Sequence, residues 1–152
     1  MEEDGYNRGP FIDSCNKRYA YLGAPYCASA MSVILDRIKA RCPSYRGGAS
    51  RNFLRGNCER IEAEDIFYGK VSPRKINYTI AVFKRNGGGH VEYVDHYCNK
   101  NQKIYCFGFN TTPVGRVGSL WNGRYSLWNY RSLRSSISPY NSFRITHFVY
   151  IK

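Results

Sequence analysis

The sequence predicts an α+β domain in which helices come first and an antiparallel β-sheet follows. Apolar residues recur at helical spacing only in the first part of the chain, before Pro43, whereas apolar segments typical of strands come after Ile66. Helices followed by strands favour α+β architecture over a parallel sheet. The 152 residues suit one domain and no Pro- or Gly-rich linker divides them, so we expect a single domain over 1–152.

Two helices are predicted near the start of the chain. Residues 10–20 begin with Pro10, which is favoured in the first helical turn, and Gly23 ends the pattern. A second helix is predicted over 28–41, and Pro43 follows it. Its apolar residues recur at i, i+3, i+4 and i+7: Met31, Ile34, Leu35 and Ile38. Between the helices and the strands we expect a loop over 43–60 with a short helix near 51–56.

The strands are predicted from apolar and β-branched residues between turn signals. They span 78–83, 90–97, 103–109 and 144–151. The segment 111–143 is rich in Gly, Ser, Asn and aromatic residues, and no element is assigned to it. Residues 119–152 are therefore treated as a C-terminal extension in which only the last strand is predicted.

Composition restricts the class of protein and the sign of its partners. Aromatic residues make up 16% of the chain, far above the level in disordered sequence, and the formal net charge is +12. Such a charge attracts polyanions, including nucleic acid, anionic lipid surfaces and polymers of the bacterial envelope. No apolar window approaches the roughly 18 residues of a membrane span. The acidic N-terminus is unlike a signal peptide, so we expect synthesis in the cytoplasm and no membrane span.

The chain has six cysteines, and none of their spacings is C-x-x-C. Without a visible export signal we expect them to be mostly reduced and to act as small buried hydrophobes. No paired spacing indicates a zinc site, and His90 with His96 lacks the H-E-x-x-H pattern. The sequence therefore predicts no metal and no cofactor.

Cys27 is the candidate nucleophile because it stands where the second helix begins. Free backbone N–H groups and the helix dipole at that end favour thiolate over thiol. Pro25 prevents the helix from extending backwards, which fixes the turn at which it starts. Cys27 also lies four residues before Met31 and so shares its apolar stripe. The alternative is that Cys27 is only a core residue.

His90 is the candidate base, since attack on an amide requires a base for the thiol and an acid for the departing amine. It follows three glycines at the start of a predicted strand, and Gly88 and Gly89 leave room for a substrate backbone. Period-2 alternation places His90, Glu92, Val94 and His96 on one face. A purely structural histidine is the alternative.

A third residue is needed to hold the imidazole in its working tautomer. Asn110 ends the strand after that of His90, and an antiparallel hairpin would return it to the neighbourhood of His90. Asp95 and Glu92 are rivals. Asp95 is predicted to face away from His90, and Glu92 would have to reach back along the same strand, so we favour Asn110.

Four segments in this order resemble the CHAP family, the cysteine, histidine-dependent amidohydrolases/peptidases of phage lysins and bacterial cell-wall enzymes. They are Asn7-Arg8-Gly9-Pro10, Ala24-Pro25-Tyr26-Cys27-Ala28, Gly88-Gly89-His90-Val91 and Gly108-Phe109-Asn110. The resemblance covers about residues 5–118. It implies a papain-like fold, with the nucleophile heading a helix packed on an antiparallel sheet, and peptidoglycan as the substrate.

Carried over by position, the resemblance makes Cys27 the nucleophile, His90 the general base and Asn110 the orienting residue. Tyr26 replaces the usual Trp as an aromatic wall and would bind substrate together with the glycines before His90. Many members carry an acidic residue two positions before the Asn, where this chain has Gly108. A fourth catalytic group is therefore missing or supplied from elsewhere.

The predicted function is that of a monomeric peptidoglycan amidase or endopeptidase, and a phage endolysin is the favoured role. Anionic polymers of the cell envelope are predicted as further binding partners. An antibacterial effector with the same chemistry is a close variant. The non-enzymatic alternative is a module that binds cell wall or, less favoured, nucleic acid through stacked aromatic and Arg side chains. Its contacts would be Trp121, Arg124, Tyr125, Trp128, Tyr130 and Arg131.

Overall fold

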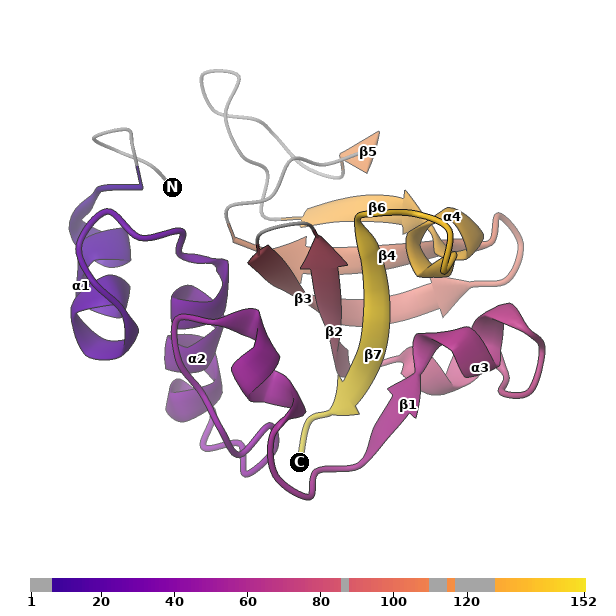
Figure 1. Cartoon of the computed structure of the whole chain (residues 1–152), viewed down its shortest axis with the longest axis horizontal. Coiled ribbons are helices and arrows are strands. Elements are labelled where there is room, and N and C mark those ends of the chain that lie inside the picture. Colours follow the sequence, from indigo (N-terminus) through magenta and orange to yellow (C-terminus); the bar gives the residue numbers. More distant parts are fainter. Residues whose placement is uncertain (1–6, 86–87, 110–114, 117–127) are drawn as a thin grey trace.

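The computed structural model describes residues 7–85, 88–109, 115–116 and 128–152, which form mixed helix and strand around an antiparallel sheet (Figure 1). The helices are α1 (Pro10–Tyr19), α2 (Cys27–Arg37), α3 (Ala63–Phe67) and α4 (Leu133–Ile137), with the 3-10 helices η1 (Ser50–Leu54) and η2 (Pro73–Ile76). The strands are β1 (Arg60–Glu62), β2 (Thr79–Arg85), β3 (Gly88–Cys98), β4 (Lys103–Gly108), β5 (Gly115–Arg116), β6 (Trp128–Ser132) and β7 (Arg144–Tyr150).

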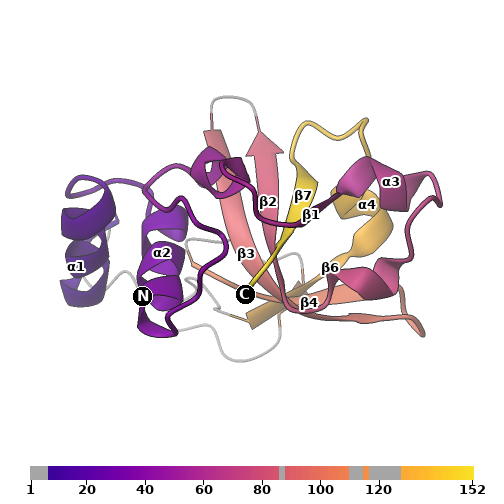
Figure 2. The ribbon, with the colours of Figure 1, turned by 90° about the horizontal axis from the view of Figure 1, so that it is seen from below.

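The sheet is covered by helices on both faces. In the described part of the chain its seven strands are ordered β1-β7-β2-β3-β4-β6-β5, and every pairing is antiparallel. Alternate residues of β2 supply the two cores: Ile80 and Val82 pack with α2, whereas Ala81 and Phe83 pack with α3 and α4. Figure 2 shows α1 and α2 at one end of the molecule and α3 and α4 at the other. The predicted α+β class is confirmed.

Both predicted helices are present, with a difference at the end of the second. α2 stops at Arg37 instead of reaching residue 41, because Lys39 adopts the left-handed conformation with φ 57° and the chain turns. Ile38 is consequently 58% exposed. Cys27, Met31 and Leu35 lie in one buried cluster, as the shared stripe predicts. None of the helices in the described ranges has the length and apolarity that crossing a membrane requires.

The four predicted strands are all present, but the far end of β3 differs. A bulge shifts the β3–β4 register between Val94 and His96, so that Val94 pairs with Cys106 and His96 pairs with Tyr105. The extra residue turns His96 to the opposite face, where its ring stacks on Tyr105 with centroids 4.7 Å apart. The prediction that His96 shares the face of His90 is therefore wrong.

The C-terminal residues belong to the sheet itself. β7 lies between β1 and β2, and β6 pairs with β4, so the segment left unassigned in the sequence supplies a strand beside the His90 hairpin. α4 then covers the core formed with Phe148 and Ile145. The pattern missed β6 because its buried positions carry Asn129 and Arg131, which are polar.

A buried polar network fixes the loop that precedes α2. Asn16 of α1 donates from Nδ2 to the carbonyl of Ala24 at 3.0 Å and accepts from Ser29 Oγ at 2.6 Å. Both Asn16 and Ser29 are fully buried. Leaving a buried polar group without its hydrogen-bond partner destabilises the fold. This network therefore fixes the path of the chain into α2.

A disulfide closes the loop that carries η1. Cys42 and Cys58 are bonded, with their Cα atoms 5.7 Å apart. The other four cysteines are free thiols, and Cys15, Cys27 and Cys106 among them are buried. The expectation of reduced cysteines is thus wrong for this one pair, which the sequence could not single out because its partners are 16 residues apart without a recognisable spacing.

Candidate active site

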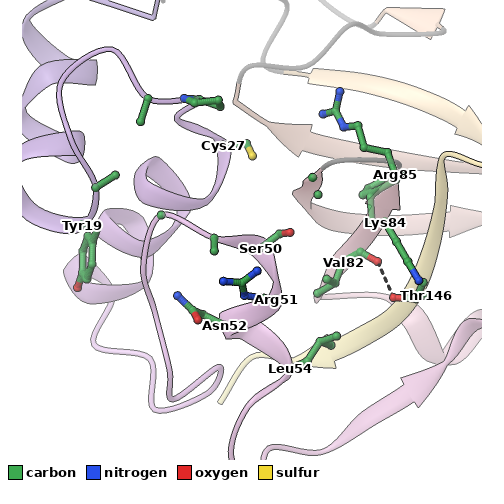
Figure 3. A pocket seen from close by; sticks show the side chains of 18 of the residues that line it. Tyr19, Cys27, Ser50, Arg51, Asn52, Leu54, Val82, Lys84, Arg85 and Thr146 are labelled. Carbon is green, nitrogen blue, oxygen red and sulfur yellow. Dashed lines mark hydrogen bonds between the residues drawn. The ribbon is translucent and has the colours of Figure 1, made fainter.

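A cleft of about 920 Å³ opens between the start of α2, the η1 segment and β2 (Figure 3). Cys27 is part of its wall, together with Ser50 of η1 and Phe83 of β2. Gly88 and Gly89, at the start of β3, also line it. The cleft therefore brings together the predicted nucleophile and the glycines that precede the predicted base.

Cys27 is the first residue of α2, which is where the helix leaves N–H groups without helical partners. Its side chain is 6% exposed, so the sulfur reaches the cleft from a mostly buried position. Backbone groups of Ala28 and Val91 lower the pKa of this thiol and so favour its ionised form. The thiol is thus surrounded by groups that stabilise negative charge.

His90 lies on β3 and is almost completely buried. Its Nε2 is 2.9 Å from Oε2 of Glu92. Its Nδ1 has no hydrogen bond of ordinary geometry within the described ranges, yet the imidazole interacts with the side chain of Cys27. Because Glu92 occupies Nε2, Nδ1 is the nitrogen left for exchanging a proton with the thiol.

Glu92 is held in turn by Arg131 of β6. The guanidinium donates from Nε to Oε1 and from Nη2 to Oε2, both at 2.9 Å, which is a bidentate pair. Asn129 adds a longer contact from Nδ2 to Oε2 at 3.5 Å. Glu92 is fully buried and Arg131 is 4% exposed, so water does not screen this pair.

Glu92, the rival of Asn110 for orienting His90, does reach back along β3 to the imidazole. Asn110 itself lies outside the described residues. The antiparallel return of β4 toward His90 is confirmed, and the described register ends with Gly108 opposite Glu92. A Cβ on Gly108 would lie 2.7 Å from Cγ of Glu92, so the glycine leaves the space that the Glu92 side chain fills.

The ionisation of the three groups is coupled. Burial opposes charge on His90, but contacts with Cys27 and Glu92 outweigh it and raise its pKa to about 9. Burial likewise opposes ionisation of Cys27, yet its contact with His90 lowers the thiol pKa below the ordinary 9.0. Glu92 is buried too, and His90 and Arg131 hold its pKa well below 4.5. At neutral pH these shifts favour an imidazolium and a carboxylate, and they move the thiol toward its thiolate form.

The three residues predicted to contact substrate have different positions. Gly88 is exposed, and a side chain there would meet nothing within 4 Å. At Gly89 a Cβ would lie 1.9 Å from Ser50 Oγ, so only glycine lets β3 approach η1 this closely. Tyr26 is fully buried with Ile12 and does not contribute to the described cleft wall, so its place is in the core.

The residues proposed for a binding module are divided in the same way. Trp121, Arg124 and Tyr125 lie outside the described residues. Trp128 is 43% exposed, and Tyr130 lies beside Tyr105 and Lys103. Arg131 is buried against Glu92, so the expectation that it contacts a ligand at the surface is wrong.

Within the described ranges no group of three or more His, Cys, Asp or Glu side chains is arranged to hold a metal ion. Comparisons of this chain with protein-family models, with curated proteins and with solved structures found no match.

Proposed function

We propose that this protein is a cysteine amidohydrolase or peptidase that uses Cys27 as nucleophile, His90 as general acid and base, and Glu92 as the residue that orients His90. The observation that carries the proposal is the buried hydrogen-bonded chain from His90 through Glu92 to Arg131, in which the imidazole interacts with the Cys27 thiol in the wall of an open cleft. A histidine that only filled the core would not need a charged partner supported by a second charge.

In the first step the Cys27 thiolate attacks the carbonyl carbon of an amide in the cleft, and a C–S bond forms as the carbonyl electrons move to oxygen. The backbone N–H of Cys27, at the start of α2, is positioned to stabilise that oxyanion. The tetrahedral intermediate collapses as the C–N bond breaks, and the His90 imidazolium gives its proton to the departing amine.

In the second step His90, now neutral, removes a proton from water, and the resulting hydroxide attacks the thioester. The acid product leaves as the C–S bond breaks, and the thiolate and imidazolium are restored. Glu92 stabilises each imidazolium form through the bond to Nε2, while Arg131 prevents Glu92 from turning away or taking up the proton. The whole cycle uses only the protons already present in the site and one water molecule, which enters in the second step.

We propose peptidoglycan as the substrate and a papain-like CHAP domain as the class. Support comes from the ordered sequence segments around Cys27 and His90, from the helix that places Cys27 beside an antiparallel sheet, and from the +12 net charge that suits an anionic envelope. Cell-wall lysis by a phage endolysin is the role this favours. An injected antibacterial effector would use the same chemistry with another delivery route.

The test is digestion of purified peptidoglycan, with the released fragments identified by mass spectrometry. Wild-type protein is expected to release new amine and carboxyl ends, whereas Cys27→Ser and His90→Ala are expected to lose activity while keeping the wild-type circular dichroism. Cys98→Ser is the matched control, because Cys98 is a free thiol at the opposite end of β3. Lysis by folded Cys27→Ser protein would refute the proposal, and binding without cleavage by all four proteins would favour a non-catalytic module.

A further inference from the structure

The cleft around Cys27 has a one-sided charge. Three of its lining residues are cationic, Arg51 of η1 and Lys84 and Arg85 of β2, and none of the described lining residues is acidic. Figure 3 shows Arg51 on one side of the hollow and Lys84 and Arg85 on the other. We call these three side chains the cationic rim.

Within the described ranges, no carboxylate of the protein neutralises the rim. All three are exposed, and none forms an ion pair with a carboxylate in the described part of the chain. By contrast, Arg46 forms an ion pair with Asp36. A cleft lined by one sign of charge concentrates ligands of the opposite sign.

Arg85 is the most fixed of the three. Its guanidinium lies 5.0 Å from the centre of the Phe143 ring, and Phe143 in turn stacks on Phe83 beside His90. Cation–π contact of this kind holds a guanidinium in place while its N–H groups remain available. The positive charge of Arg85 is therefore held beside the aromatic pair that packs against His90.

We propose that the cationic rim binds a carboxylate of the substrate close to the amide that Cys27 attacks. This rests on the proposed amide hydrolysis and names the feature of the substrate that selects the bond. A carboxylate is the anion that a peptide offers next to its own amide bonds, and an Arg fork binds it through two parallel hydrogen bonds. The rim acts on the substrate, whereas the cation that stabilises the Cys27 thiolate is His90.

The first test uses Cys27 itself and needs no substrate. Iodoacetate and iodoacetamide both alkylate a thiolate, forming C–S and releasing iodide, but only iodoacetate carries a carboxylate. The rate of each reaction at Cys27 is followed by peptide mass mapping, and the iodoacetate rate is divided by the iodoacetamide rate. At low ionic strength we expect this ratio to be about tenfold higher in the folded protein than in the unfolded chain. Tenfold is the lower end of the rate increase that a charge-focusing cleft produces. Taking the ratio cancels differences in thiolate content between variants.

The variants separate the rim from the overall charge. Arg51→Gln/Lys84→Gln/Arg85→Gln is expected to bring the ratio down to that of the unfolded chain, and high salt is expected to do the same in wild type. Lys100→Gln is the control, because it removes an exposed charge in the β3–β4 turn, away from the cleft. A wild-type ratio equal to that of the unfolded chain overturns the proposal. The proposal is also overturned if Lys100→Gln lowers the ratio as much, per charge removed, as the triple variant does.

The second test compares two synthetic peptides that differ only in a carboxylate or carboxamide beside the scissile bond. The carboxylate peptide should have about tenfold higher kcat/KM in wild type, and this preference should vanish in the triple variant. Equal kcat/KM values for the two peptides in wild type overturn the proposal that the rim binds a substrate carboxylate. Should neither peptide nor peptidoglycan be cut, hydrolysis itself fails, and the alkylation ratio still decides whether the cleft selects carboxylates.

Discussion

Replacing Glu92 by Gln tests the buried chain, because the change preserves shape and removes one charge. Glu92 accepts one bond from His90 and two from Arg131, all at 2.9 Å and all inaccessible to water. A Gln side chain keeps one acceptor oxygen and places an NH₂ group against N–H donors. Removing one partner of a buried pair leaves the other charge uncompensated, so unfolding free energy should fall by about 3–5 kcal/mol.

The same change should impair catalysis. Without the carboxylate the pKa of His90 falls, fewer imidazolium groups stabilise the Cys27 thiolate, and kcat/KM should drop at least about 100-fold. Glu92→Gln/Arg131→Met separates the two effects. Removing the unpaired guanidinium should restore stability to within about 1.5 kcal/mol of wild type, as in a volume-conserving core exchange, without restoring activity.

Denaturant unfolding and hydrolysis assays on these variants supply both quantities. Glu92→Gln protein with unchanged kcat/KM would refute the orienting role, and so would recovery of activity in the double variant. The charge also sets acid stability: the pKa of folded Glu92 lies below 4.5, so its contribution is present above pH 4.5 and is lost as the pH falls further. Glu92→Gln should remove that dependence.

Two further predictions concern the site directly. The pH profile of kcat/KM should be bell-shaped. It should rise as Cys27 ionises, with a pKa below the ordinary thiol value of 9.0, and fall near pH 9 as His90 loses its proton. A single rise with no alkaline fall would count against His90 as the acid. Gly89→Ala should lower stability, because the new Cβ collides with Ser50. Gly88→Ala enters open space and should leave stability near wild type. Thermal melts compare the pair, and equal melting temperatures would contradict the close approach of β3 to η1.

Local signals were sufficient for much of the fold and for two of the site residues. The apolar stripe and the Pro before it predicted where α2 begins, and therefore that Cys27 heads a helix. The glycines and the alternating pattern predicted the strand of His90. Both features depend on residues near one another in sequence, where helix and strand periodicity are informative.

The third member of the site depends on contacts that sequence spacing does not reveal. Glu92 reaches His90 because Arg131, 39 residues away, anchors its carboxylate, and β6 was not predicted because its buried positions are polar. Gly108 was a usable signal: a residue without a side chain opposite an acid in a hairpin indicates that the acid fills that space. No comparable feature of the sequence indicates the bulge that turns His96 to the opposite face of the sheet.

The most direct test of the account is a pH titration of thiolate absorbance, taken as the difference between wild type and Cys27→Ser so that only one thiol is observed. A transition below pH 9.0 is expected, and His90→Ala should move it upward, because the imidazolium that stabilises the thiolate is gone. A Cys27 that titrates at its ordinary value, with or without His90, would contradict the proposed catalytic pair.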